Sequence, residues 1–151
     1  MRTRKSSRIL VINEQLEVLL FQFSHVQGAL AGKKYWATIG GGLKENESFQ
    51  EAASRELYEE TGILRKSVGS CIAKRDFQMQ LPSAEIVFAE EQFFIVFVQQ
   101  SEIDTSHWTL NEIKTICAYK WWNLKNLRQT KEQIFPEDLV DILLINTPHQ
   151  L

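Results

Sequence analysis

The chain has 151 residues, of which 44% are hydrophobic and 24% are charged, and these proportions exclude a disordered or collagen-like protein. This length is typical of one domain, so we expect a single domain over residues 1–151 that folds without a disulfide. The formal net charge of −2 argues against a nucleic-acid polymer as partner, because such partners usually require a basic surface.

Neither a secretion signal nor a membrane span is expected from the sequence. The apolar stretch Ile9–Ile12 is followed at once by Asn13, which leaves it too short for a signal peptide. No run approaches the roughly 18 apolar residues that a membrane-spanning helix requires. The two cysteines, Cys71 and Cys117, lack the spacing of a disulfide framework or zinc site. We therefore expect a cytoplasmic protein with no membrane partner, present as a monomer or homodimer.

Short apolar runs alternate with polar segments in the first part of the chain, and this pattern indicates paired strands. The runs Ile9–Ile12 and Val18–Phe21 predict a hairpin. The polar segment Ser24–Lys34 predicts a loop. Tyr35–Ile39 predicts a strand that runs directly into the three glycines at positions 40–42.

A helix with clear start and stop signals is predicted after the glycines, over residues 49–61. Ser48 and Glu51 form a capping-box pattern, and good helix formers continue through Glu60. Gly62 suits the left-handed conformation that commonly follows the last turn of a helix.

The second half of the chain mixes strands and helices. We predict strands over Val68–Phe77, Ile86–Val98 and Ile116–Trp122, and helices over Trp108–Lys114 and Pro136–Ile145. The order lacks a regular strand–helix–strand alternation. The pattern therefore favours an α/β protein of the α+β kind.

Three carboxylates share one face of the predicted helix. At about 100° per residue, Glu56, Glu59 and Glu60 fall within one arc that also holds small and apolar residues, whereas Arg55 lies on the exposed side. Like charges at these spacings repel, and burying them is costly unless a cation pairs with them. A hard divalent cation suits such oxygen ligands, although a solvated acidic face is the commoner explanation of a charge run.

Two features beside this helix face favour the cation. Gly40, Gly41 and Gly42 let backbone N–H groups approach an anion closely, just before the helix begins. Arg55 precedes Glu59 by four residues, so it can orient that carboxylate by a charge-assisted hydrogen bond. Phosphate-binding backbone beside a cation-binding carboxylate face is the layout required to hydrolyse a phosphoanhydride.

The spacing of these residues resembles the complete box of the MutT-like Nudix hydrolase family, G-x5-E-x7-R-E-U-x-E-E-x-G-U, where U is aliphatic. All nine fixed positions match, and so many positions at fixed spacing rarely arise by chance. They are Gly41, Glu47, Arg55, Glu56, Leu57, Glu59, Glu60, Gly62 and Ile63. The preceding segment 36–43 resembles the family's W-x-x-P-G-G-G, with Ile39 in place of the proline. Residues 104–127 are similar to one bacterial branch of the family.

The resemblance implies an α/β/α sandwich with a mixed β-sheet, in which the box forms a loop–helix–loop. It implies a hydrolase that cleaves the pyrophosphate bond of a nucleoside diphosphate linked to another group, with Mg²⁺ or Mn²⁺ as cofactor. Carried over by position, it assigns Glu56, Glu59 and Glu60 both to the metal and to catalysis. Gly41 is expected to lend its carbonyl or amide to the same site.

The resemblance also gives supporting roles to other residues of the box. Arg55 is expected to orient the catalytic carboxylates, and Glu47 to support them as a further acidic residue. From their backbone N–H groups, which can approach an anion closely, Gly40, Gly41 and Gly42 are expected to contact the phosphates of the substrate.

Three residues outside the box are candidates for the site. Glu112 precedes the predicted strand Ile116–Trp122, and we expect it on a loop that swings over the cleft as general base. The alternatives are that Glu112 is an ordinary helix-surface glutamate and that a box glutamate, first of all Glu56, is the base. Arg75 and Glu91 are candidate substrate contacts, against the alternatives of a solvated cation and a strand-end charge.

The intact carboxylates favour an enzyme over a non-catalytic Nudix-like module that senses a nucleotide or holds a partner. We expect a small-molecule nucleotide or diphosphate as substrate, and water attack at phosphorus without a covalent intermediate. The segment 77–81 lacks the proline and tyrosine that mark two Nudix substrate classes. Nucleoside triphosphates, nucleotide sugars and isoprenoid diphosphates therefore stay open as substrates.

Overall fold

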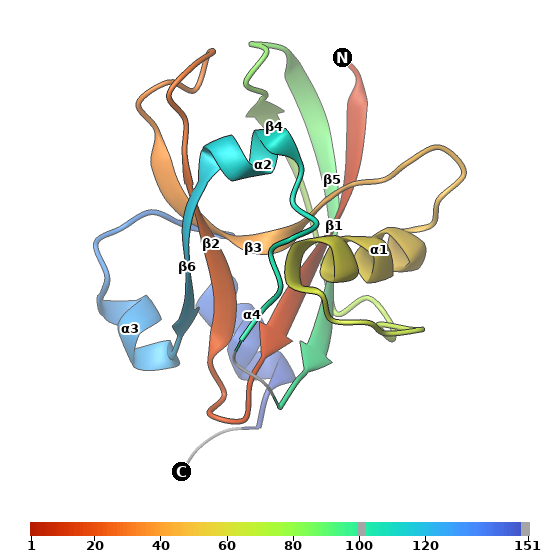
Figure 1. Ribbon diagram of the computed structural model, residues 1–151, viewed down its shortest axis with the longest axis vertical. Coiled ribbons are helices and arrows are strands. Elements are labelled where there is room, and N and C mark those ends of the chain that lie inside the picture. The colour runs from red at the N-terminus through yellow and green to blue at the C-terminus, as the bar shows by residue number, and fades with distance from the viewer. Residues whose placement is uncertain (100–101, 149–151) are drawn as a thin grey trace.

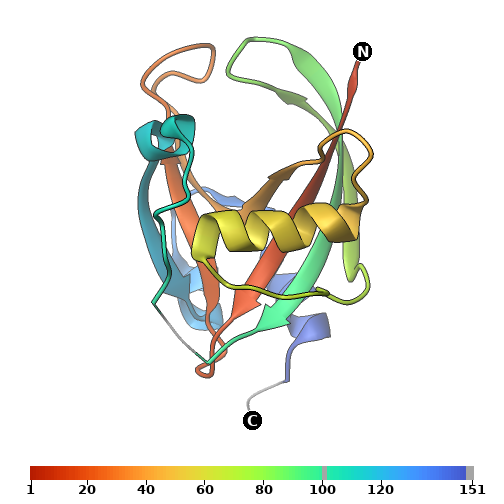
Figure 2. The ribbon, with the colours of Figure 1, turned by 45° about the vertical axis from the view of Figure 1, so that its right-hand side comes forward.

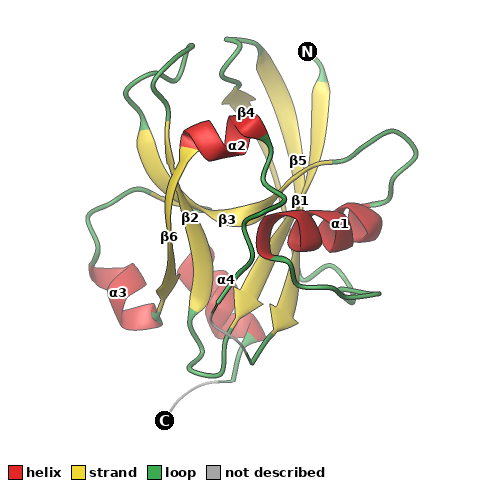
Figure 3. Ribbon diagram, viewed as in Figure 1, coloured by secondary structure: helices red, strands yellow, loops and turns green. Residues whose placement is uncertain are grey.

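The computed structural model describes residues 1–99 and 102–148, which form one curled β-sheet with helices on both of its faces (Figure 1). The predicted domain limit at Leu151 lies outside the described residues. The strands are β1 (Thr3–Ile12), β2 (Val18–Ser24), β3 (Lys34–Gly42), β4 (Ala73–Gln80), β5 (Ile86–Phe97), β6 (Ile116–Trp122) and β7 (Ile134–Phe135). The helices are α1 (Phe49–Thr61), α2 (Leu110–Thr115), α3 (Leu124–Gln129) and α4 (Leu139–Asn146), coloured red in Figure 3.

The sheet is mixed, with the strand order β4-β5-β1-β2-β3-β7 and with β6 paired to β2. Strands β1 and β5 are parallel over ten residue pairs, whereas β1 and β2 meet as the predicted hairpin at Ile12 and Val18. Strand β3 is shared between two partners. Its first half pairs with β2, where Tyr35 lies opposite Phe23, and its last residues pair with β1, where Gly40 lies opposite Arg8. The sheet therefore curls, and Figure 2 shows its two halves diverging with β3 crossing between them.

Alternate residues of the central strands supply two separate cores. In β1, Ile9 and Val11 belong to the core under α1, while Leu10 and Ile12 belong to the core under α3 and α4. A strand buried on both faces requires a continuous apolar run, which explains the sequence at Ile9–Ile12. Helices thus cover both faces of the sheet, and the predicted α/β/α sandwich with a mixed sheet is confirmed.

Helix α1 begins and ends where its capping residues predict. The Ser48 hydroxyl accepts a hydrogen bond from the Glu51 N–H at 3.1 Å, and the Glu51 carboxylate accepts from the Ser48 N–H at 3.0 Å. Gly62 has a φ of 76° and donates its N–H to the Tyr58 carbonyl at 2.8 Å. These contacts satisfy backbone groups that a helix leaves unpaired at its two ends. They fix the helix that carries the box carboxylates.

Several element limits differ from the predictions. The strand expected over Val68–Phe77 begins only at Ala73, because Gly69 has a φ of 77° and interrupts an extended backbone. Val68 is buried all the same, within the core under α1. Helix α4 starts three residues after Pro136. Neither α3 nor β7 was predicted, and the two residues of β7 are too few for a periodic pattern.

Candidate active site

A cleft of about 740 Å³ gathers most of the residues that the sequence singled out. Helix α1 lines one side of it, α2 lies across from α1, and the glycine run of β3 lies between them. The lining includes every box glutamate of α1, the glycines and the candidate base. These residues are Gly40, Gly41, Gly42, Arg55, Glu56, Glu59, Glu60 and Glu112.

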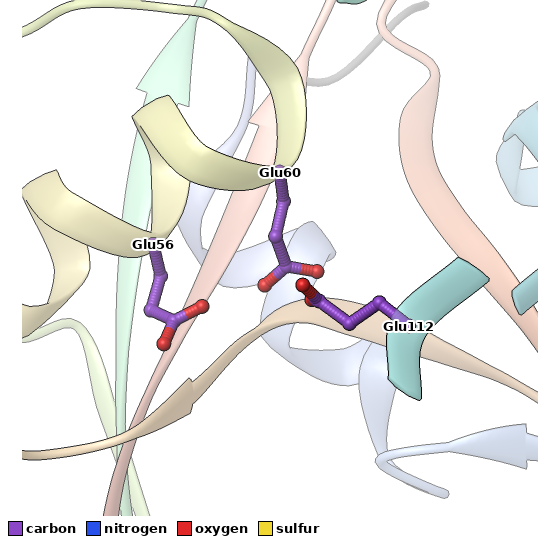
Figure 4. Close-up of side chains that lie close together, drawn as sticks. All are labelled: Glu56, Glu60 and Glu112. Atoms are coloured by element: carbon purple, nitrogen blue, oxygen red, sulfur yellow. The ribbon is translucent and has the colours of Figure 1, made fainter. Parts of the chain in front are cut away.

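Three carboxylates in this cleft converge on one point. Glu56, Glu60 and Glu112 each offer a carboxylate oxygen, and the three oxygens lie within 4.8 Å of one another (Figure 4). Glu56 and Glu60 come from successive turns of α1, while Glu112 comes from α2 on the opposite side. Because a buried group of negative charges is costly without a compensating cation, this set of hard oxygen donors suits a divalent metal ion.

Glu60 is the most deeply buried member of the cluster, with 1% of the residue exposed. Burial raises the pKa of its carboxyl well above the usual range, and the negative charges of Glu56 and Glu112 act in the same direction. The backbone N–H of Gly40 opposes this shift, since it donates to Glu60 Oε1 at 3.0 Å. The Glu60 carboxylate is therefore held in place by the glycine run.

The first two glycines of the run allow close packing against α1 and β1. Gly40 has a φ of 138°, and a Cβ atom there would collide with the carbonyl oxygen of Ser7 on β1. A Cβ atom on Gly41 would lie 2.6 Å from the Glu56 Oε1. The backbone thus requires glycine at Gly40, whereas at Gly41 a side chain would have to displace a carboxylate of the cluster.

Arg55 connects the box residues by five hydrogen bonds. Its guanidinium donates to both carboxylate oxygens of Glu47, at 2.7 and 2.8 Å, and to Glu56 Oε1 at 2.9 Å. It also donates to Glu59 Oε2 at 3.2 Å and to the Gly42 carbonyl at 3.0 Å. The bidentate pair with Arg55 lowers the pKa of the Glu47 carboxyl below its usual range.

The exposed position expected for Arg55 is wrong, because only 19% of its side chain is exposed. Its Cα lies on the flank of the helix, but the long side chain turns back over the acidic face, where it finds four acceptor groups. Helical periodicity places the Cα and not the end of a long side chain, and this accounts for the difference.

The family model described as NUDIX domain matches residues 2–141. The chain belongs to the Nudix family. The family and the enzyme class predicted from the box, a Nudix-type pyrophosphohydrolase, are thereby confirmed. The complete box of the chain forms α1 and its two flanking loops, and it lines one side of the carboxylate cleft described above.

Solved structures of other Nudix proteins share the fold. The MutT protein from Methanosarcina mazei Go1 is 24% identical, with 95% of this chain and 92% of that chain covered and a TM-score of 0.67. The dihydroneopterin triphosphate pyrophosphohydrolase of E. coli is 18% identical, with 97% and 100% covered and a TM-score of 0.65. The NUDIX domain of Shewanella oneidensis NrtR, solved with ADP ribose, is 15% identical, with 96% and 87% covered and a TM-score of 0.63.

No protein of curated function matches the sequence. Among the described residues of this Nudix protein, no helix has both the length and the apolar character that crossing a membrane demands.

Two of the predicted carboxylates occupy unexpected positions in the Nudix site. Glu59 lies at the edge of the cleft with 36% of its side chain exposed, and it contacts Arg55 without joining the cluster. Glu112 lies in α2 and not on a mobile loop, because it forms a capping box with Thr109, whose N–H donates to Glu112 Oε1 at 2.9 Å. The cluster thus has two glutamates from the box and one from outside it.

Arg75 and Glu91 do not reach the carboxylate cleft. Both line a neighbouring cavity of about 340 Å³, which shares Arg8 and Tyr35 with the cleft. Glu91 is buried against Arg8, with 2.9 Å between Glu91 Oε2 and Arg8 Nε, and Arg75 lies over the ring of Phe77 at 5.0 Å. Their role as substrate contacts stays a prediction, and such contacts would be made from this neighbouring cavity and not from the carboxylate cleft.

Two cationic side chains of the cleft were not predicted from the sequence. Arg4 and Arg8 both line the cleft, and Arg4 also donates to the Ser6 hydroxyl at 2.6 Å. Arg4, Ser6 and Arg8 alternate along β1, so their side chains share one face of the strand. The signal was present as the period-two pattern of Arg4, Ser6 and Arg8, but the predicted strand began only at Ile9.

Proposed function

We propose that this Nudix protein hydrolyses the pyrophosphate bond of a nucleoside diphosphate linked to another moiety, such as a nucleoside triphosphate or a nucleotide sugar. The observation that carries the proposal is the convergence of Glu56, Glu60 and Glu112 in one cleft. The same cleft contains the cations of Arg4 and Arg8, which suit a polyanionic substrate. Carboxylates for a metal and cations for phosphates are the two requirements of phosphoanhydride hydrolysis.

Mg²⁺ or Mn²⁺ is the cofactor that we propose. The side chains that would hold it are Glu56 and Glu60, with Glu112 facing them. Gly41 lies beside the Glu56 carboxylate, and Glu59 lies at the edge of the same cleft. A bound divalent cation supplies positive charge that stabilises a transferring phosphoryl group and makes water a better nucleophile. The donor set fits, because carboxylate oxygens are the ligands that these cations prefer.

The residues of the chain have separate tasks in the proposed reaction. Arg55 fixes Glu56 and Glu59 by hydrogen bonds and so maintains their orientation. Arg4 and Arg8 contact the phosphates, helped by backbone groups of the glycine run. The reaction is direct attack of water at phosphorus.

Glu112 is the general base that we propose for this reaction. Its carboxylate lies close enough to Glu56 and Glu60 for one water molecule between them to contact it, since two hydrogen bonds span roughly 5.6 Å. Glu112→Gln is expected to lower kcat by at least about 100-fold while Mn²⁺ affinity changes little. A fall in Mn²⁺ affinity that matches the fall in kcat would instead make Glu112 a metal ligand.

The size of the site supports a nucleotide as substrate. The cleft of about 740 Å³ and the adjoining cavity of about 340 Å³ together exceed what a bare diphosphate requires. The solved relatives named above include a dihydroneopterin triphosphate pyrophosphohydrolase and a domain solved with ADP ribose. Dihydroneopterin triphosphate and ADP ribose both contain a diphosphate attached to a bulky organic group. This is the substrate class that we propose.

A nucleotide-sensing module without catalysis is the second candidate function, because the Nudix domain of NrtR was solved with ADP ribose. One experiment separates the two. The purified protein is incubated with a panel of nucleoside triphosphates, nucleotide sugars and ADP ribose, with Mg²⁺ or with excess EDTA, and the products are separated by ion-exchange chromatography. An enzyme cleaves at least one compound with Mg²⁺ and none with EDTA. Tight binding without any cleavage would support the sensing module and overturn the proposal.

A further inference from the structure

The last turn of α1 contacts the segment that leads to α2. The carbonyl oxygens in the last turn of a helix lack partners within the helix and must find them elsewhere. Here the Trp108 indole N–H donates to the Glu60 carbonyl at 2.8 Å, and the Asp104 backbone N–H donates to the Thr61 carbonyl at 2.9 Å. Figure 1 shows this segment passing the C-terminal end of α1 before it enters α2.

Close approach of this segment depends on Gly62. A Cβ atom on Gly62 would lie only 2.7 Å from the Cβ of Asp104. The fixed glycine of the Nudix box therefore does more than end the helix, because it also leaves room for the segment to pack against the last turn.

Trp108 connects the end of α1 to the core and to the start of α2. Its ring packs against Phe21 of the core, with 5.2 Å between ring centroids, while its N–H reaches Glu60. The next residue, Thr109, is the N-cap of α2, and Glu112 follows three positions later. Helix α2 buries none of its own residues, so its own packing does little to fix its position.

Glu60 thus contacts both α2 and the residue that leads into it. Its carboxylate lies in the cluster with Glu112, and its carbonyl accepts the hydrogen bond from Trp108. We propose that Trp108 is a positioning residue, whose indole N–H holds α2 against the end of α1 and so keeps Glu112 at the carboxylate cluster. The inference rests on the proposed function only in that it takes Glu112 as the base.

Trp108→Phe tests the proposal, because phenylalanine keeps an aromatic ring against Phe21 but cannot donate to Glu60. The first measurement is hydrogen exchange of the α2 backbone, including the Ile113 N–H that donates to Thr109 at 2.9 Å. Hydrogen exchange can be measured whether or not the protein is an active enzyme. We expect the α2 amides to exchange about fivefold faster or more in the variant, the factor that corresponds to one net hydrogen bond, while α1 amides stay unchanged.

The second measurement is a double-mutant cycle on kcat between Trp108→Phe and Glu112→Gln. Glutamine preserves the capping box at position 112, so α2 persists in that background. Alone, Trp108→Phe is expected to lower kcat about fivefold to tenfold with KM little changed. In the Glu112→Gln background, it is expected to change kcat by less than about twofold, because the group that it positions is already inactive.

Trp122→Phe is the matched control. Trp122 is buried in the opposite core against Trp36, and its indole N–H has no hydrogen-bond partner within the described part of the chain. The same change of side chain there should leave α2 exchange and kcat within about twofold of the wild type. If Trp108→Phe fails to fold, benzothienylalanine at position 108 removes the N–H and retains the bicyclic ring.

The outcomes are distinct. Unchanged α2 exchange in the Trp108 variant overturns the proposal, as does an equal loss of kcat in both backgrounds of the cycle. A wild type that cleaves no compound of the substrate panel overturns the proposed function instead, and the exchange measurement then decides by itself whether Trp108 holds α2.

Discussion

The backbone N–H of Gly40 donates a 3.0 Å hydrogen bond to the Oε1 of Glu60, which joins the glycine run of β3 to the most buried carboxylate of α1. The contact links the residue just before the Nudix box to a glutamate near its end, 20 positions later in the sequence. A single donor offsets only part of the cost of burying a carboxylate among others. Repulsion among these carboxylates therefore opposes folding, and a bound cation would offset it.

Glu60→Gln is expected to make the metal-free protein more stable. The neutral amide has the same shape, can still accept from Gly40 and no longer repels Glu56 and Glu112. We expect the free energy of unfolding to rise by about 1–2 kcal/mol in urea titrations with EDTA at neutral pH. Glu51→Gln, at the exposed start of the same helix, should change it little because glutamine also serves in a capping box. A clear loss of stability in Glu60→Gln would argue against the repulsion.

Glu59→Gln and Glu60→Gln are each expected to lower kcat by at least about 100-fold, the size typical of removing an electrostatic element of a transition state. Steady-state rates on the best compound of the substrate panel, with saturating Mg²⁺, measure the effect. Both variants should keep the far-ultraviolet circular dichroism of the wild type. Near-normal turnover in either one would remove that glutamate from the catalytic site.

Alanine at Gly40 and at Gly41 should have different effects. At Gly40 the new Cβ meets the Ser7 carbonyl in a left-handed backbone, so we expect a loss of about 2 kcal/mol or more in stability. At Gly41 it meets only the end of the Glu56 side chain, which can shift at the expense of its contact with Arg55, so stability should fall little while kcat falls. Thermal unfolding and kinetics of the two variants measure this. Gly69→Ala is the control, because Gly69 also has a positive φ but an added Cβ there would contact no other atom of the described residues. It measures the cost of the backbone conformation without a collision. Equal stabilities for the Gly40 and Gly41 variants would contradict the packing described.

The pair between Glu47 and Arg55 should make stability depend on pH in the acid range. The pKa of Glu47 is lowered in the folded protein, so the unfolded chain binds more protons as pH falls below about 4.3, and stability falls with pH. The contribution of the pair is complete above the unfolded pKa and disappears as pH falls through the folded one. The difference in unfolding free energy between wild type and Glu47→Gln should therefore shrink from pH 6 to pH 3. A constant difference would mean that Glu47 is unpaired in solution.

Local features of the sequence predicted the box helix well, because its caps at Ser48 and Gly62 and its acidic arc depend on neighbours within a few residues. The convergence of Glu112 on that helix could not be predicted as geometry. It depends on how residues 102–109 pack against the end of α1 and on one contact of Trp108. Local patterns contain no information about such packing.

The cations of the cleft were missed for a related reason. Arg4 and Arg8 look like a solvated basic start of the chain until β1 is known to pair with β5 from Thr3 onward. That pairing extends β1 beyond its apolar part and turns one face of it toward the cleft. Pairing between distant strands, and not the composition of β1, decides the surroundings of these arginines.

The central claim is that water attacks phosphorus directly in a diphosphate held at the carboxylate cluster. A single-turnover reaction in ¹⁸O-labelled water, with enzyme in excess over the best compound of the panel and Mg²⁺ present, tests it most directly. Mass spectrometry of the products should find one solvent oxygen in one phosphate-containing product, and the product that carries it identifies the phosphorus attacked. Products that contain no solvent oxygen after that turnover would contradict the account.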